Sequence, residues 1–103
     1  MMGRIRERFP RLELLEQATV YAVGHAVLKT LVDTPTLGHP TNFLLNVAND
    51  FNADAANAQG RLEYCLSEAW AWLKSECLIC EKMEHASWVF VSRRGQEAGR
   101  AQV

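Results

Sequence analysis

The segment 61–76 most constrains how this chain of 103 residues can fold. Its apolar residues recur at spacings of three and four, so at 100° per residue they fall on one narrow helical face: Leu62, Leu66, Ala69 and Leu73. Directly afterwards, Leu78-Ile79 and Ser87–Val91 have the composition of short strands separated by a charged loop. The pattern predicts a long helix that passes straight into a β-hairpin.

Two further helices are expected upstream. Apolar residues spaced three to five apart predict one helix from about Pro10 to about Val32, and Pro35 ends it by disfavouring the α conformation of Thr34. Gly24 lies inside this helix, where glycine costs about 1 kcal/mol unless something packs closely against it. A shorter helix is expected from about Thr41 to Asp50, burying Phe43, Leu44 and Val47. The predicted fold is therefore mainly α with a small β-hairpin, three helices and then a C-terminal antiparallel hairpin, which is a winged helix-turn-helix-like arrangement.

The size predicts a single domain over residues 1–103, with a basic N-terminal arm at 1–9 and a frayed tail at 96–103. A net charge of −1 conceals a segregation: +3 over residues 1–11, −6 over 12–92 and +2 over 93–103. An acidic middle argues against the broad basic face of a typical nucleic-acid-binding protein. No apolar run is long enough for a membrane span, and three cysteines favour a reducing cytoplasm.

Two segments carry a resemblance to a known group of proteins: Glu68–Leu73, followed by Leu78-Ile79, and Trp88–Gly95. They resemble the winged-helix module of uncharacterised bacterial proteins that carry a C-terminal HEPN-like domain linked to phage defence. Asn42-Phe43-Leu44 is similar to the start of that group's second helix, so the resemblance covers about residues 42–95. It implies a winged helix.

This chain departs from that group in two ways. Cys77 stands where the group has a glycine between helix and strand, a place where a left-handed residue is common. Cysteine either adopts that conformation at a cost of roughly 1 kcal/mol or forms a different turn. The C-terminal domain is expected to be absent, because the chain ends at Val103 and lacks the HEPN signature of an arginine four to six residues before a histidine.

The titratable residues do not form a familiar catalytic or metal-binding pattern. Cys77 and Cys80 make a C-x-x-C, but zinc would need two more ligands, for which only Cys65 and His85 offer themselves. A redox pair normally begins a helix, whereas this pair follows one, so small buried hydrophobic residues are the better interpretation. His25 and His39 have no partner at a useful spacing. We expect no enzyme activity, no metal, no cofactor and no small-molecule substrate.

The favoured function is a non-catalytic interaction module that self-associates, as a dimer, or docks another protein. Tryptophan and tyrosine are enriched at interface centres, so the candidate contact residues are Trp70, Trp72 and Tyr64, with the two tryptophans 200° apart around the helix. The alternative is weak, largely sequence-independent DNA binding by the basic ends and the wing base. Its candidate residues are Arg93, Arg94, Arg4, Arg6, Arg8 and Lys74.

Overall fold

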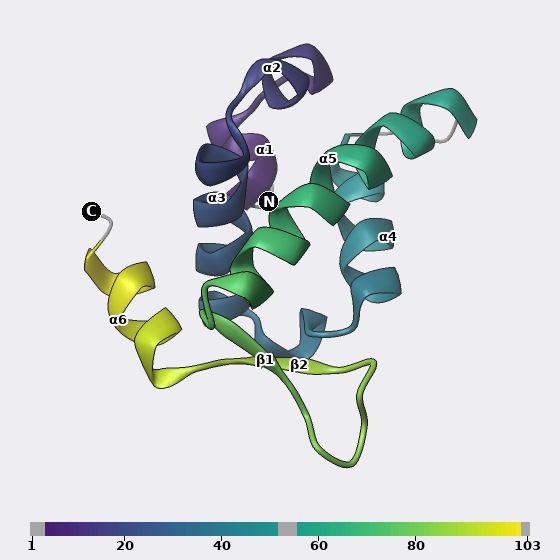
Figure 1. Cartoon of the computed structure of the whole chain (residues 1–103). Helices are drawn as coiled ribbons and strands as arrows, with labels where there is room; N and C mark the ends of the chain where they lie inside the picture. The colour runs from purple at the N-terminus through teal and green to yellow at the C-terminus, as the bar shows by residue number, and fades with distance from the viewer. Residues whose placement is uncertain (1–3, 52–55, 102–103) are drawn as a thin grey trace.

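The computed structural model describes residues 4–51 and 56–101, and it is mainly helical with a two-stranded antiparallel hairpin (Figure 1). In chain order the elements are α1 (Arg4–Arg8), α2 (Leu12–Gln17), α3 (Val20–Asp33), the 3-10 helix η1 (Pro35–Leu37), α4 (Pro40–Asp50), α5 (Ala56–Ser75), β1 (Ile79–Glu81), β2 (Val89–Val91) and α6 (Arg93–Ala101). The mainly α architecture with a hairpin after the longest helix is confirmed. Within the described ranges, no helix is both long and apolar enough to span a membrane.

The core is centred on α3 and α5, which make the most extensive contact between elements. All four residues of the predicted α5 stripe are buried, and they share one cluster with α3 and α4 residues that include Val27, Leu31, Phe43 and Val47. Burial of each large apolar side chain contributes about 1.5–3 kcal/mol. The periodicity of 61–76 thus identified the correct buried face, although α5 itself begins earlier, at Ala56.

The indole of Trp72 on α5 packs directly against Gly24 of α3. A Cβ atom built at Gly24 would lie 2.5 Å from Cε3 and 2.7 Å from Cζ3 of Trp72. The absence of a side chain on α3 therefore makes the space that the indole of α5 occupies. This contact explains why a residue of poor helix propensity stands in the middle of a buried helix.

Replacing Gly24 by alanine is expected to lower the free energy of unfolding by about 1–3 kcal/mol, because overpacking outweighs the gain in helix propensity. Gly60→Ala is the matched control: Gly60 is also helical, but nothing lies within 4 Å of its Cβ position. Gly60→Ala should raise the free energy of unfolding by roughly 0.5–1 kcal/mol, because alanine has the higher helix propensity. Urea unfolding followed by circular dichroism measures both, and equal stability of the two variants would contradict the close approach.

The single helix predicted over Pro10–Val32 is wrong, because the chain forms two helices there. α2 ends at Gln17, and Thr19 is extended and caps α3 by accepting a hydrogen bond from the Ala22 N–H at 3.1 Å. Threonine is a favoured N-cap, and the apolar spacing runs through the break without revealing it. α2 is fastened to α5 instead, since the Arg61 Nε–H donates to Glu16 at 2.8 Å and this hydrogen bond lowers the pKa of the Glu16 carboxyl.

The basic N-terminal arm is also corrected. Residues 4–8 form α1, and Ile5 and Phe9 are 1% and 7% exposed within the core. These two residues stand four apart, so they fall on the same side of a helical turn and can be buried together. α1 packs against α3 and α4, while residues 1–3 of the expected arm lie outside the described part of the chain.

The frayed tail expected at 96–103 is helical through Ala101, as part of α6, and residues 102–103 lie outside the described range. Ser92 caps the helix by accepting a hydrogen bond from the Gly95 N–H at 3.0 Å. Two glycines allow α6 to pack closely: a Cβ at Gly95 would lie 2.0 Å from the Leu78 carbonyl oxygen, and one at Gly99 3.1 Å from Val32. Glycine has low helix propensity, but in α6 these two glycines form the surface that contacts Leu78 and Val32.

α5 ends in a Schellman motif. The Leu78 N–H donates to the Leu73 carbonyl at 3.0 Å, the Cys77 N–H donates to the Lys74 carbonyl at 3.1 Å, and Cys77 has a φ of 58°. Of the two possibilities at this position, the left-handed conformation and a different turn, Cys77 adopts the first. Its thiol is exposed, so the interpretation of this cysteine as a small buried hydrophobic residue is wrong, and Cys80 is only half-buried.

Cys77→Gly is expected to raise the free energy of unfolding by about 0.5–1 kcal/mol, because glycine adopts the left-handed conformation without the Cβ penalty. Ser75→Gly is the control on the last turn of α5, where φ is helical and glycine should destabilise by a similar amount. Thermal unfolding of both variants would contradict this account if Cys77→Gly had the lower midpoint.

The hairpin pairs Ile79 with Val91, Cys80 with Phe90 and Glu81 with Val89. The predicted hairpin is confirmed, but its first strand begins one residue later and ends two residues later than predicted, while the second lacks the first two predicted residues. It is docked beside the connection between α3 and α4. The Val89 N–H donates to the Gly38 carbonyl at 2.9 Å, and the ring of Trp88 meets His39 edge-on at 5.2 Å. The hairpin is thus held to the helical body along β2.

Candidate protein-interaction site

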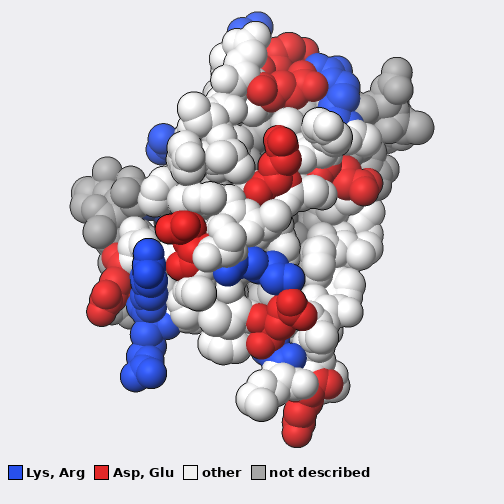
Figure 2. Space-filling view, viewed as in Figure 1, with Lys and Arg blue, Asp and Glu red and all other residues white. Residues whose placement is uncertain are grey.

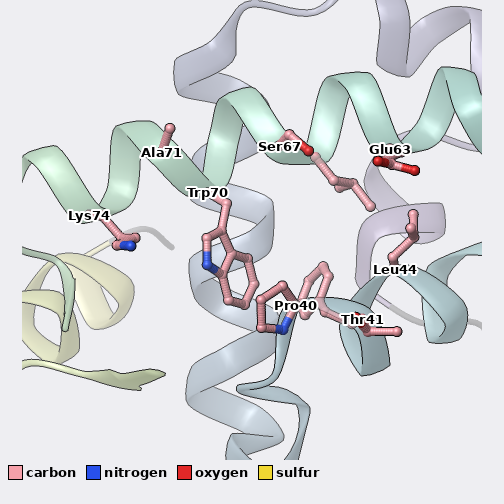
Figure 3. A pocket seen from close by; sticks show the side chains of 10 residues that line it. Pro40, Thr41, Leu44, Glu63, Ser67, Trp70, Ala71 and Lys74 are labelled. Carbon is pink, nitrogen blue, oxygen red and sulfur yellow. The ribbon is translucent and has the colours of Figure 1, made fainter. Parts of the chain in front are cut away.

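An open groove of about 520 Å³ lies between α4 and α5 (Figure 3). α4 lines it with residues from its first turn, and α5 lines it with residues spaced three or four apart over about three turns. The α4 residues are Pro40, Thr41, Phe43 and Leu44. The α5 residues are Glu63, Leu66, Ser67, Trp70, Ala71 and Lys74. The groove is therefore a continuous strip along the exposed side of the longest helix.

Aromatic rings form one side of this groove. Trp70 is half-buried and meets the buried Phe43 edge-on, with ring centroids 5.4 Å apart, and Figure 3 shows its indole reaching toward Pro40. Ser67 and Ala71 stand beside it on α5 and have short side chains, so they leave the strip open to solvent. An accessible aromatic surface next to small residues can receive an apolar side chain from a partner.

The three aromatic residues predicted for an interface fall into three different places. Trp70 lies in the groove, and Tyr64 is 76% exposed on α5, one turn before Ser67. Trp72 lies on the opposite shoulder, as the 200° separation requires. It is packed against α3, with the rings of Tyr21 and His25 at 5.3 and 5.9 Å. At 100° per residue Tyr64 lies about 120° from Trp70 around α5, and it does not line the groove. The structure therefore places only Trp70 of the three in the groove and uses Trp72 in packing.

Glu63 and Lys74 carry opposite charges at the two ends of the α5 strip. The Lys74 ammonium also lies 2.7 Å from Glu81 on β1, and Arg94 lies 3.7 Å from Glu76. In the view of Figure 2, acidic and basic side chains of the described residues are interspersed, with no broad basic patch on this face. The positive charges near α5 thus have carboxylates close to them.

The basic residues predicted to contact DNA are distributed over separate elements. Arg4, Arg6 and Arg8 belong to α1, whereas Arg93 and Arg94 begin α6 beside the hairpin, at the other end of α3 in Figure 1. Arg6 donates a hydrogen bond to the Asp50 carbonyl, and the Arg8 guanidinium lies 5.9 Å from the centre of the Phe9 ring. The structure does not bring the two arginine groups together.

The cysteines and histidines of the described residues do not form a common site. The described residues contain no group of three or more side chains that could hold a metal ion. Burial raises the pKa of the Cys65 thiol, which disfavours the reactive thiolate. His39 caps α4 by accepting from the Thr41 N–H at 3.2 Å, while His85 is exposed in the hairpin loop.

Sequence reasoning missed the α4 side of the groove. Phe43 and Leu44 were expected in the core, and Phe43 is buried, but Leu44 is half-buried at the groove wall. The one sequence signal for this side of the groove was Pro40, which favours a helix start. α4 does begin at Pro40, and its first turn lines the groove together with α5. Comparisons of the chain with protein-family models, with curated proteins and with solved structures gave no match.

Proposed function

We propose that the chain is a non-catalytic winged-helix interaction module that associates with a second copy of itself through the α4–α5 groove. The winged-helix part is supported by the order α3, α4, α5 and hairpin, and by the docking of β2 beside the α3–α4 connection through Val89 and Gly38. The resemblance of 68–73 and 88–95 to the HEPN-associated modules supports the same fold, and with it a cytoplasmic role connected with phage defence.

The groove is the observation that carries the functional proposal. Trp70 supplies aromatic area on the α5 side of the groove, and Leu44 adds apolar surface from α4. Interfaces concentrate binding energy in tryptophan and tyrosine at well-packed centres. A rigid strip formed by two helices offers such a centre without a change in backbone conformation.

The charge on α5 argues against DNA as the ligand of this face. Neutralising phosphates takes lysine and arginine, but the exposed strip carries Glu63 against Lys74, which is itself paired with Glu81. Glu68 adds a further exposed carboxylate elsewhere on α5. A winged helix serves either protein or nucleic acid, so the choice rests on these side chains and not on the fold.

The chain is expected to be dimeric in sedimentation velocity at tens of micromolar and above. Ala71→Glu should weaken the dimer at least about tenfold, because it buries an unpaired carboxylate in an apolar contact. Asn46→Glu is the matched control: it adds the same charge to an exposed position of α4 that does not line the groove. A strict monomer from micromolar to near-millimolar concentration would overturn the proposal.

Duplex DNA is expected to bind only weakly, at micromolar affinity or worse at physiological salt, with a log–log salt slope of about −3 to −5. Arg93→Ala combined with Arg94→Ala should reduce that slope by about 2, because both side chains are exposed at the start of α6. Fluorescence anisotropy of labelled duplex DNA at two salt concentrations measures the affinity and its salt slope. Tight or strongly sequence-selective binding would favour the DNA alternative over the protein-interaction proposal.

A further inference from the structure

From the charge pattern of the groove we infer how the two copies meet: α5 of one copy packs antiparallel to α5 of the other, with Glu63 of each facing Lys74 of its partner. This inference rests on the proposed self-association and adds the orientation and the residues that determine it. Both residues line the groove, and both belong to the side of α5 that faces away from the core.

The two charges are arranged to match a copy of themselves. Glu63 and Lys74 lie about 16 Å apart along the same face of α5, at a rise of about 1.5 Å per residue. A two-fold axis perpendicular to the helix, at the level of Glu68 and Ala69, exchanges their positions and sets each carboxylate opposite an ammonium. A closed dimer of this kind uses the same patch on both copies, so one chain must carry both charges.

The opposite orientation is disfavoured by the same residues. In a parallel pair in register, Glu63 would meet Glu63 of the partner and Lys74 would meet Lys74 of the partner. Like charges at close quarters across an interface are repulsive, and they select against the wrong arrangement. The charge pattern therefore chooses the antiparallel pair.

The residues between the two charges suit close helix packing. Ser67 and Ala71 are short, and helices that meet through short side chains approach to an interaxial distance of about 8–10 Å. Under the two-fold axis Ser67 lies opposite Trp70 of the partner, so each indole faces a short side chain. Leu44 from α4 flanks the contact on each copy.

The ion pair between Lys74 and Glu81 does not prevent this contact. Its two side chains are 41% and 43% exposed, and exposed pairs of this kind contribute little to stability. An ammonium carries three N–H donors, so Lys74 can retain Glu81 and also donate to a second carboxylate. The pair with Glu81 is therefore compatible with a contact between Lys74 and Glu63 of the partner copy.

Charge reversal tests the orientation. Glu63→Lys alone and Lys74→Glu alone should each weaken the homodimer about ten- to thirtyfold at low salt, because two attractive pairs become repulsive. An equimolar mixture of the two variants should restore dimerisation, since the first then carries two lysines and the second two glutamates at the facing positions. Glu76→Lys is the control, a charge reversal directly after the end of α5 and outside the groove.

Sedimentation velocity, with circular dichroism to show that each variant is folded, separates the outcomes. Loss of dimer in each variant and recovery in the mixture support the antiparallel pair. A wild-type dimer that withstands both reversals, or a mixture that does not recover, overturns the orientation while self-association stands. A wild-type chain that stays monomeric overturns the proposed function together with this inference.

Discussion

The packing of Trp72 on Gly24 is the contact on which the rest of the arrangement depends. Because α3 presents no side chain at that point, the indole lies where a Cβ would otherwise stand, and α5 sits close on α3. The rotation of α5 is then determined. Its leucine stripe faces the core, Trp70 faces α4, and the side with Ser67 and Ala71 is left to solvent.

The parts of the fold that could be predicted were those with a periodic signal. The stripe from Leu62 to Leu73 and the β-rich segment around Val89 are local patterns, and both lead to the observed elements. The break at Thr19 could not be seen, because one capping hydrogen bond overrides a periodicity that continues on both sides of it. α6 was missed because Gly95 and Gly99 lower helix propensity, while the close packing they permit depends on residues far away in the sequence.

The candidate site illustrates the same limit. The helical angle between Trp70 and Trp72 was enough to place them on opposite shoulders, but it did not tell which shoulder faced α3. Tertiary packing decided that, with Tyr21 and His25 against Trp72 and with Phe43 against Trp70. The ion pair between Lys74 and Glu81 could not be predicted either, because it joins a helix to a strand whose register the sequence does not give.

The connection between α3 and α4 belongs to the groove and the hairpin at once. Gly38 accepts the hydrogen bond from Val89, His39 meets Trp88, and the next two residues, Pro40 and Thr41, form the groove wall. The anchor of β2 and the wall of the groove therefore belong to one run of four consecutive residues. The backbone path of these residues thus determines both where β2 is attached and where the groove wall stands.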